Sequence, residues 1–480
     1  MPTPEGIPPE QLAAFLAVID LLGELPVDHP DAVRARQATS GLWKSIKERR
    51  RREVQQRKAD HDAAITGATA TGAPGRIDDE TAGIPLAATG DGIVGTLVRP
   101  RACYICKQRY TAVDAFYHQL CPDCAAKNHT RRDARTDLTG RRALLTGGRA
   151  KIGMYIALRL LRDGAHTTIT TRFPADAVRR FQAMPDAEDW IDRLRIVGID
   201  LRDPRQVIAL ADDVVAAGPL DILINNAAQT VRRSSGSYGA LVSGESVGSG
   251  WLEAARPDVL VLGHPHDAHP LAITGLTTDE HLIAAEAMTA LAMTAGSSSL
   301  ERTEAGTAID AGGLVPDLVD INSWTQNVEQ VDPVELLEVQ LCNVTAPFLL
   351  VSRLRPSLAA SPARRKYIVN VSAMEGQFGR GYKGPGHPHT NMAKAALNML
   401  TRTSAQEMFE RDAILMTAVD TGWITDERPH TTKARLHEEG FHAPLDLVDG
   451  AARVYDPIVR GETGDDQLGV FLKDYEPHPW

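Results

Sequence analysis

Four of the five cysteines lie close together in the chain. Cys103 and Cys106 form one CxxC pair, and 14 residues separate it from the second pair, Cys121 and Cys124. Two such pairs at this separation are the usual way to bring four thiolates around one tetrahedral zinc ion. Four sulfur ligands leave no position open for a substrate, so we expect a structural rather than a catalytic zinc site.

A redox role is the alternative interpretation of these cysteines. A single CxxC pair can exchange disulfides, but a second pair nearby favours closed metal coordination. His118 and His129 are close in sequence, but four cysteines already satisfy the ion, so we expect both histidines to be surface or packing residues. Cys342 stands alone, and this distribution is not that of a disulfide framework.

A glycine-rich turn lies in residues 141–153, RRALLTGGRAKIG, between a short apolar strand and the start of a helix. Such a turn brings backbone N–H groups and a helix N-terminus to a pyrophosphate. The turn alone is a weak sign, but strand, turn and helix occur here in the required order. We therefore expect a dinucleotide site at this turn.

The next strand of this unit, HTTITTRF, ends in Thr171 and Arg172 rather than in Asp or Glu. An acidic residue there would bind the ribose 2′-hydroxyl of NAD, whereas an arginine suits the extra phosphate of NADP. Arg149 in the turn could add a second positive contact. NADP is therefore the expected coenzyme, and the alternative is a surface arginine without a ligand.

Two further strands are expected to border the same site. RLRIVGIDLRD places Asp200 and Leu201 where they can border an adenine. DILINNAAQT is the following strand, and it ends at Asn226 and Ala227. From about Asp137 onward, short β-branched runs alternate with amphipathic stretches, which predicts an α/β fold with a parallel sheet covered by helices on both faces.

With these segments identified, the chain from about 137 to 480 resembles the short-chain dehydrogenase/reductase (SDR) superfamily. TGGRAKIG resembles the family turn TGxxxGxG, and NNAA resembles the family strand end NNAG. The resemblance implies a Rossmann-type doubly wound sheet. Lys151 stands where the family has its middle glycine. The turn residues that this resemblance assigns to the coenzyme are Thr146, Gly147, Arg149, Lys151, Ile152 and Gly153.

Later segments extend the resemblance to the catalytic centre. Asn343, in VELLEVQLCNVTAPF, matches the family asparagine that organises a water-linked proton path. Ser372, in KYIVNVSAM, matches the serine that orients the substrate oxygen, and Lys394, in TNMAK, matches the lysine that holds the nicotinamide ribose. Thr421 and Gly422 take the place of the family's Pro-Gly beside the nicotinamide, so Thr421 is expected to contact the coenzyme.

The catalytic tyrosine of the family is missing from this segment. The residue one helical turn before Lys394 is Thr390, whose hydroxyl can face the lysine but does not ionise as a phenol does. Histidine is a plausible general acid near pH 7, and His387 and His389 lie just before the helix, while Tyr382 lies in the preceding loop. The histidines could equally cap the helix or line the loop without transferring protons.

Composition limits the possible classes of protein. At 480 residues the chain suggests two to four units, and its 43% hydrophobic and 24% charged residues are ordinary for a globular protein. A formal net charge of −10 disfavours a general attraction to nucleic acid or anionic membranes. The opening residues lack a basic segment followed by an apolar core, and we found no uninterrupted apolar run of roughly 18 residues. We expect a cytoplasmic protein.

The segment 1–65 is expected to be helical, with one helix at 9–23 and a second from Pro30 to about Ile65. KERRRREVQQRK, residues 47–58, is interpreted as a solvated or partner-facing surface rather than a nucleic-acid patch, because the rest of the chain is acidic. Residues 66–94 are small and glycine-rich and are expected to form a linker.

The cysteine module is placed at 95–130, and the SDR-like domain at 137–480. Within that domain, residues 231–318 break the alternation and are interpreted as an insertion. The insertion contains a plausible strand at 258–264 and a plausible helix at 278–295.

Two hypotheses from different classes follow. The first is an NADP(H)-dependent oxidoreductase that acts on a small carbonyl or alcohol, with Ser372, Lys394 and Asn343 in the family's roles and with His389 or Thr390 handling the proton. The second is a catalytically inactive NADP-binding scaffold or sensor that engages a protein partner through the N-terminal helices. The resemblance also implies a homo-oligomer.

Overall fold

The computed structural model does not describe every residue of the chain. The described residues are 6–74, 76, 86–88, 90–233, 235–245, 256–262, 314, 319–379, 381, 383–425 and 427–480. The helix expected at 278–295 lies outside them, and so does Tyr382.

The described residues form a nine-stranded sheet in the order β11-β10-β9-β8-β6-β3-β4-β5-β7. Its neighbouring strands are parallel except for the antiparallel pair of β10 and β11. The chain moves outward from β3 to β5 and then returns to β6, so the expected doubly wound Rossmann-type sheet is confirmed. The strands are β3 (Arg142–Leu145), β4 (His166–Thr171), β5 (Leu194–Gly198), β6 (Ile222–Asn225), β7 (Asp258–Val261), β8 (Lys366–Ser372), β9 (Ile414–Asp420), β10 (Phe471–Lys473) and β11 (Glu476–His478).

The central strands are buried along their whole length, as parallel strands covered on both faces must be. All residues of β6, β8 and β9 are buried. Along β8 the side chains alternate between two hydrophobic cores, with Tyr367 and Val369 in one and Ile368 in the other. This burial fixes the carboxyl ends of the strands, where the expected site residues lie.

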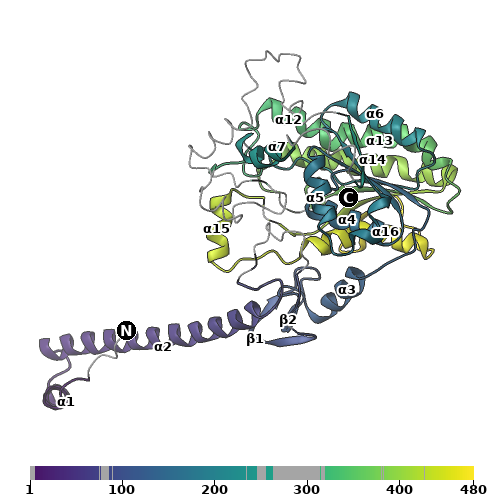
Figure 1. Cartoon of the computed structure of the whole chain (residues 1–480). Helices are drawn as coiled ribbons and strands as arrows, with labels where there is room; N and C mark the ends of the chain where they lie inside the picture. The colour runs from purple at the N-terminus through teal and green to yellow at the C-terminus, as the bar shows by residue number, and fades with distance from the viewer. Residues whose placement is uncertain are drawn as a thin grey trace.

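Helices cover both faces of the sheet (Figure 1). On one face are α4 (Lys151–Arg162), α5 (Pro174–Gln182) and α16 (Leu447–Glu462), and their apolar side chains join one core. Helices on the other face pack into the second core: α6 (Pro204–Ala216), α13 (Ala346–Ala359) and α14 (Pro388–Asp412).

A continuous helical run, Pro333–Ala359, is long and apolar enough by composition to cross a membrane. It consists of α12 (Pro333–Gln340), a π-helical turn at Leu341–Thr345 and α13. Leu350 and Leu354 of this run are fully buried against the sheet, so it serves here as a core helix. The shorter elements are η1 (Ala187–Asp189), η2 (Ile191–Arg193), η3 (Ser235–Tyr238), α7 (Gly239–Glu245), η7 (Met374–Gly376) and α15 (His430–Glu438).

The insertion contributes one described strand to the main sheet. β7 pairs in parallel with β5, so the strand expected at 258–264 is confirmed over Asp258–Val261. It extends the edge of the sheet rather than starting a separate one.

The cysteine module consists of the antiparallel pair β1 (Ile93–Ala102) and β2 (Arg109–Asp114), followed by α3 (Pro122–Arg132). It docks on the α16 side of the domain, where Tyr117 and Leu120 share one core with Val454. The module and the sheet domain are therefore held together by a common apolar interior.

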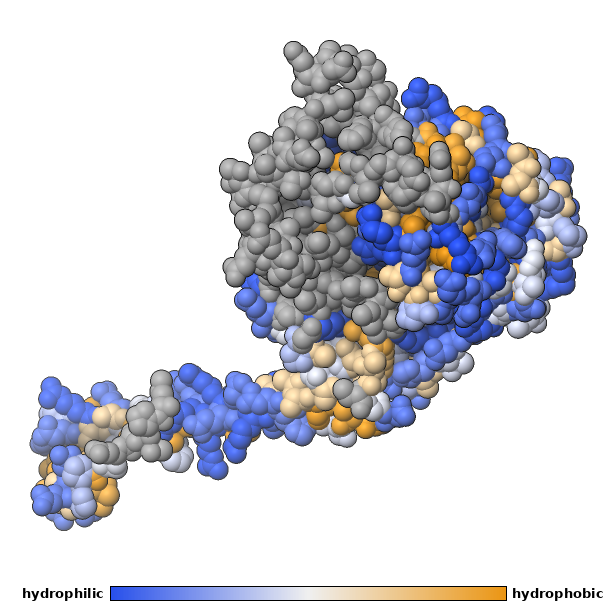
Figure 2. All heavy atoms as spheres, in the orientation of Figure 1, coloured by the Kyte–Doolittle hydropathy of each residue, from blue (hydrophilic) through white to orange (hydrophobic). Residues whose placement is uncertain are grey.

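The N-terminal helices are α1 (Pro9–Glu24) and α2 (Pro30–Gly67), and α2 extends away from the rest of the molecule (Figure 1). Its middle is hydrophilic, whereas apolar side chains gather near the tip of the arm (Figure 2). Exposed apolar residues of these helices include Phe15 and Leu16 of α1 and Trp43 of α2, and α1 buries no residue.

The start of the expected linker at 66–94 differs from the expectation. Ala70 and Thr71 are buried, and their amides donate to Ala115 O and Phe116 O at 3.0 and 2.9 Å. Small residues permit this close approach to the cysteine module. The described part of this segment therefore packs against the module instead of forming an extended linker. Part of the segment lies outside the described residues.

Candidate active site

The turn between β3 and α4 is shaped by close backbone contacts. Gly147 has a φ of +70°, and a Cβ on it would lie 3.0 Å from Ala227 Cα. A Cβ on Gly153 would lie 1.9 Å from Gly147 O, so only glycine fits there. Lys151 keeps the left-handed conformation of the glycine that it replaces, with a φ of +52°. An L-residue in this conformation costs about 1–2 kcal/mol.

Thr146 and Asn226 tie this turn to the end of β6. The Asn226 and Ala227 amides both donate to Thr146 Oγ1 at 3.0 Å. Asn226 Nδ2 donates to Gly147 O at 3.1 Å. The Thr146 hydroxyl is thus occupied by hydrogen bonds within the protein. Thr146 does not line the neighbouring cavity, which differs from the coenzyme contact expected of it.

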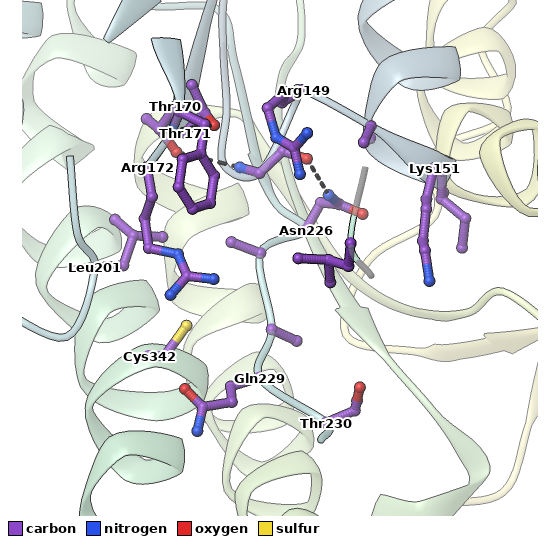
Figure 3. A pocket seen from close by; sticks show the side chains of 18 of the residues that line it. Arg149, Lys151, Thr170, Thr171, Arg172, Leu201, Asn226, Gln229, Thr230 and Cys342 are labelled. Atoms are coloured by element: carbon purple, nitrogen blue, oxygen red, sulfur yellow. Dashed lines mark hydrogen bonds between the residues drawn. The ribbon is translucent and has the colours of Figure 1, made fainter. Parts of the chain in front are cut away.

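A cavity of about 410 Å³ opens beside this turn at the carboxyl ends of β4, β5 and β6. This is where open α/β sheets bind their ligands, and the volume lies in the range of small-molecule sites. Figure 3 shows Arg172 and Lys151 on opposite sides, with Asn226 between them. The expected coenzyme residues that line it are Gly147, Arg149, Lys151, Ile152, Gly153, Arg172, Asp200, Leu201, Asn226 and Ala227.

The two arginines of the cavity differ in their partners. Arg149 forms an ion pair with Asp176, and burial lowers the pKa of Arg149. The guanidinium carbon of Arg172 lies 4.8 Å from the centre of the Tyr238 ring and 5.5 Å from that of Phe173, and the side chain points into the cavity (Figure 3). Arg172 is therefore better placed than Arg149 to bind an anion, and the second contact expected from Arg149 is already taken by a carboxylate.

Asp200 lines the cavity, but its carboxylate is paired. Arg202 Nη2 lies 2.6 Å from Asp200 Oδ2, and Arg202 Nη1 lies 2.8 Å from Glu338 Oε1. Glu338 Oε2 in turn accepts from Gln229 Nε2 at 2.8 Å. This buried network, which the sequence did not reveal, links Asp200 at the wall of the cavity to α12 and to Asn343.

Asn343 lies in the π-helical turn and is fully buried. Its Oδ1 accepts from the Gln229 amide at 2.7 Å, and its Nδ2 donates to Gln229 O at 3.0 Å. Both Gln229 and the neighbouring Cys342 line the cavity, and burial raises the pKa of the Cys342 thiol to about 11. Asn343 thus adjoins the cavity through residues on either side of it; π-helical turns are frequent at functional sites.

The buried face of α14 carries Thr390, Lys394 and Asn398 at successive i+4 positions. Lys394 Nζ donates to Val371 O at 2.8 Å, and Ser372 Oγ donates to Asn398 Oδ1 at 2.5 Å. Burial lowers the pKa of Lys394 to about 8, against the opposing effect of the Cys342 thiol and two carboxylates. The structure thus brings Ser372 and Lys394 together at the ends of β8 and α14, although neither lines the cavity itself.

Three of the four candidates for the missing tyrosine lie among the described residues, and they have different surroundings. His387 stacks on Trp324 with ring centres 4.0 Å apart, and its Nδ1 lies 2.8 Å from Trp324 O. His389 and Thr390 are buried, yet neither ring nitrogen of His389 nor Thr390 Oγ1 has a hydrogen-bond partner among the described residues. His387 therefore packs against Trp324 at the helix start without capping the helix, whereas the polar side-chain atoms of His389 and Thr390 make no hydrogen bond among the described residues.

Glu335 of α12 faces His389. Its Oε1 lies 3.7 Å from His389 Nε2 and accepts a hydrogen bond from Ser323 Oγ. Burial opposes ionisation of Glu335, but His389 and Ser323 outweigh it, so the pKa of this carboxyl is lowered. Sequence reasoning did not find this pair, because α12 and α14 are far apart in the chain.

The loop after β9 differs from the expectation for Thr421. Thr425 and Glu427, rather than Thr421, line the cavity. Trp423 is 39% exposed, its ring lies 5.1 Å from that of Phe441, and its amide donates to Tyr104 Oη at 2.9 Å. The segment that approaches the cavity is therefore displaced a few residues along the chain from the Pro-Gly position.

The four clustered cysteines come together in space. Their Sγ atoms all lie within 4.8 Å of one another, and those of Cys106 and Cys121 are 3.7 Å apart. Ligands of a tetrahedral zinc ion with Zn–S bonds of about 2.3 Å would be roughly 3.8 Å apart, so the cluster is suited to a metal ion. His118 instead contacts Thr71 Oγ1 at 2.8 Å, and His129 contacts Asp114 at 3.1 Å, as expected of packing residues.

Comparison with known proteins supports the reading of this fold. Residues 141–238 match the family model described as short chain dehydrogenase. The uncharacterized protein R665 of Acanthamoeba polyphaga mimivirus is 31% identical over 375 residues, which cover 76% of this chain and 72% of that protein. The part of the chain that this family model matches, residues 141–238, belongs to the short-chain dehydrogenase/reductase superfamily.

Relatives named as oxidoreductases or reductases match shorter parts of the chain. A probable oxidoreductase of Streptomyces antibioticus is 40% identical over 19% of this chain and 30% of that protein. The ketoacyl reductase HetN of Nostoc is 32% identical over 22% of this chain and 35% of that protein. These alignments span only about a third of the length of each relative, so they do not establish the activity of the whole chain.

Solved SDR structures are similar in fold at low sequence identity. A short chain dehydrogenase from Burkholderia cenocepacia in complex with NADP is 20% identical, covering 70% of this chain and 97% of that one, with a TM-score of 0.44. NADPH-bound carbonyl reductase from chicken fatty liver is 17% identical, covering 72% and 100%, with a TM-score of 0.43.

Proposed function

We propose that this chain is an NADP(H)-dependent oxidoreductase that reduces a small carbonyl compound or oxidises the corresponding alcohol. The observation that carries the proposal is the cavity beside the glycine-rich turn, with the Arg172 guanidinium pointing into it from the end of β4. The oxidoreductase names of the Streptomyces relatives agree with this assignment.

The residues of the cavity fit a phosphorylated dinucleotide. Backbone N–H groups of the turn and the N-terminus of α4 suit a pyrophosphate, and Lys151 lines the same side. Arg172 suits a 2′-phosphate, and its position at the end of β4 is the one that decides between NAD and NADP in such folds. When bound, the coenzyme supplies or accepts the hydride.

Lys394 and Ser372 are assigned to positioning. The buried ammonium of Lys394 would hold the nicotinamide ribose, because its position on α14 matches the family lysine. Ser372 Oγ, at the end of β8, would donate to the substrate oxygen after exchanging its present acceptor, Asn398 Oδ1. Asn343 would hold Gln229 and the adjoining water in place.

We assign the proton to His389. A buried imidazole whose ring nitrogens make no hydrogen bond among the described residues has capacity for a new one, and Glu335, 3.7 Å from Nε2, can stabilise the imidazolium. Thr390 is assigned a different task, because an aliphatic hydroxyl can hydrogen-bond to the reacting oxygen without giving up its proton at neutral pH. The pair would share the work of the missing tyrosine.

Turnover of NADPH with a panel of aldehydes, ketones and quinones tests the proposal. We expect a loss of nicotinamide absorbance with at least one substrate class, and no loss with Lys394→Ala. Binding of NADPH without turnover across the panel would instead support the inactive scaffold or sensor.

We further propose that Cys103, Cys106, Cys121 and Cys124 hold one structural zinc ion. The clustering of their sulfurs supports this, since four thiolates so close together need a cation to offset their mutual repulsion. Metal analysis of the purified protein is expected to find about one zinc per chain, weakened or lost in Cys103→Ser; metal-free protein with the same melting temperature would contradict it.

The homo-oligomer, the protein partner at α1 and α2, and the cytoplasmic location remain predictions. The exposed apolar side chains of Phe15, Leu16 and Trp43 favour an interaction at the N-terminal helices. Light scattering of wild-type protein and of Phe15→Glu would test for a self-association that the substitution removes.

A further inference from the structure

The loop that follows β9 forms a flap over one edge of the coenzyme cavity. We define the flap as the described residues between Trp423 and Phe441, which include α15. Thr425 and Glu427 of the flap line the cavity, and Asn322 Nδ2 donates to Glu427 O at 2.8 Å. The position of the flap therefore decides how this edge of the cavity is closed.

The first end of the flap is attached to the cysteine module. The Trp423 amide donates to Tyr104 Oη at 2.9 Å, and Tyr104 directly follows the first metal-ligand candidate, Cys103. Gly422 permits this contact: its φ is +80°, and a Cβ there would lie 2.6 Å from Leu445 Cδ1. The Trp423 and Phe441 rings then meet across the base of the flap.

The second end of the flap is attached to the same module. Gln119 Nε2, two residues before Cys121, donates to His442 O at 3.3 Å. Arg76, which packs beside the module through Thr71 O, donates to Ala443 O at 2.7 Å and to Leu445 O at 2.6 Å. Arg76 is buried, so these bonds are shielded from water.

The N-terminus of α16, just beyond the flap, is also bound by the module. Arg132 donates to both carboxylate oxygens of Asp446 at 2.6 and 2.7 Å, and Tyr117 Oη donates to Asp449 Oδ1 at 2.7 Å. Asp446 caps α16 by accepting from the Asp449 amide. The start of α16, next to the flap, is thus fixed by residues of α3 and of the loop that precedes α3.

From these contacts we propose that the cysteine module sets the position of the flap, and that Tyr104 is a positioning residue for coenzyme binding. A metal ion on the four cysteines would fix the knuckle that carries Tyr104. Tyr104 fixes Trp423, and the flap then presents Thr425 and Glu427 to the cavity. The last step, from flap to coenzyme, rests on the proposed function; the steps before it do not.

The chain offers a matched control in the same module. Tyr110 of β2 is a buried tyrosine whose Oη donates to His118 O at 2.9 Å, within the module. Tyr104→Phe removes the acceptor of the Trp423 amide, whereas Tyr110→Phe removes an internal bond of the module. Both substitutions delete one oxygen and keep the ring.

The experiment compares full-length wild type, Tyr104→Phe and Tyr110→Phe for the rate of trypsin cleavage after Lys433 and Arg435, both in α15. Loss of one hydrogen bond is expected to raise the Tyr104→Phe rate by about two- to tenfold, with Tyr110→Phe near wild type. Removal of the metal from wild type by a chelator is expected to raise the rate at least as much.

Kinetics with NADPH give the second readout. Tyr104→Phe is expected to raise the KM for NADPH about two- to tenfold with kcat unchanged, because it removes binding rather than transition-state interactions. Tyr110→Phe is expected to change neither. The cleavage assay does not depend on turnover. If Tyr104→Phe is cleaved faster but the wild type does not oxidise NADPH, the proposed function is rejected, while the link from Tyr104 to the flap is supported.

Equal cleavage rates in Tyr104→Phe, Tyr110→Phe and wild type, with no change on chelation, would overturn the inference. Metal content and melting temperature of Tyr104→Phe must match those of wild type. A Tyr104→Phe protein that has lost its metal would also overturn Tyr104 as the link, because the effect would then belong to the metal site itself.

Discussion

The two ends of the site are built differently. At the phosphate end, the side chains of Thr146 and Asn226 are bonded within the chain, and Arg149 is paired with Asp176. At the catalytic end, the His389 ring nitrogens and Thr390 Oγ1 are buried without a hydrogen-bond partner among the described residues. The side chains named at the phosphate end already have partners within the chain. Those named at the catalytic end have polar atoms that could still form hydrogen bonds.

This difference indicates where a ligand contributes most. A buried polar group without a partner costs about 1–3 kcal/mol, so two neighbouring residues of this kind on α14 require an explanation. A substrate oxygen or an ordered water would supply the missing bonds. The bonded side chains of Thr146, Asn226 and Arg149 need no such explanation, because they hold the shape of the turn, and ligand binding at this end is assigned to Arg172.

Replacing Lys394 by Met is expected to have the largest effect. It removes the buried cation that is assigned to the ribose, and kcat/KM should fall about 10³- to 10⁴-fold. Steady-state NADPH oxidation measures this, and Lys58→Met on the exposed surface of α2 is the control. Equal activity in the two variants would contradict a role for Lys394 in the reaction.

His389→Gln and Thr390→Val test which of these two residues transfers the proton in place of the missing tyrosine. If His389 carries the proton, His389→Gln should lower kcat about 100-fold, whereas Thr390→Val should lower it less than tenfold. Glu335→Gln should lie between them, because it acts through His389. The reverse ranking of the first two variants would assign the proton to the path through Thr390.

Arg172→Ala tests the phosphate end. Loss of a charge-assisted hydrogen bond of about 1.5–3 kcal/mol should raise the Kd for NADPH roughly 10- to 100-fold and leave the Kd for NADH within about twofold. The control is Arg205→Ala, since the Arg205 side chain is 87% exposed. A uniform loss of affinity for both coenzymes would contradict a role in recognising the 2′-phosphate.

The pH dependence of binding follows from the pKa of Lys394, which burial lowers to about 8. Below that pH the side chain is an ammonium that can donate to the ribose, and above it the amine predominates. Affinity for NADPH should therefore fall as pH rises above 8, by about tenfold per unit, and this fall should vanish in Lys394→Met. Calorimetric titrations between pH 7 and 10 measure it.

Lys151→Gly should have the smallest effect, and its two consequences have opposite signs. Glycine accepts the φ of +52° without strain, so unfolding should cost about 1 kcal/mol more, which in a chain of this length raises Tm by only about 1 °C. Loss of the ammonium should weaken NADPH binding by a few fold. An unchanged affinity would exclude Lys151 from the coenzyme contacts.

Local patterns made the phosphate end predictable from the sequence. Gly147, Gly153 and Arg172 lie at fixed offsets from β3 and β4, and the turn conformation depends on residues close to it in the chain. The partners of these residues were not predictable in the same way. Asp176 of α5 pairs with Arg149 of the turn, and predicting this pair would require knowledge of how α5 approaches the turn.

The catalytic end depended more on distant parts of the chain. The sequence placed Ser372, Lys394 and Thr390 correctly on β8 and α14, but not the different surroundings of His387 and His389. Those are set by Trp324 and Glu335, more than 50 residues earlier. The attachment of the flap to the cysteine module was equally hidden, because Tyr104 lies over 300 residues from Trp423.

The most direct test is a calorimetric titration of the full chain with NADPH, repeated with Arg172→Ala. We predict that NADPH binds saturably to one site per chain and that it binds more weakly to Arg172→Ala. Absence of heat with both NADPH and NADP⁺ at high protein concentration, together with no protection of the flap from trypsin by either, would contradict it.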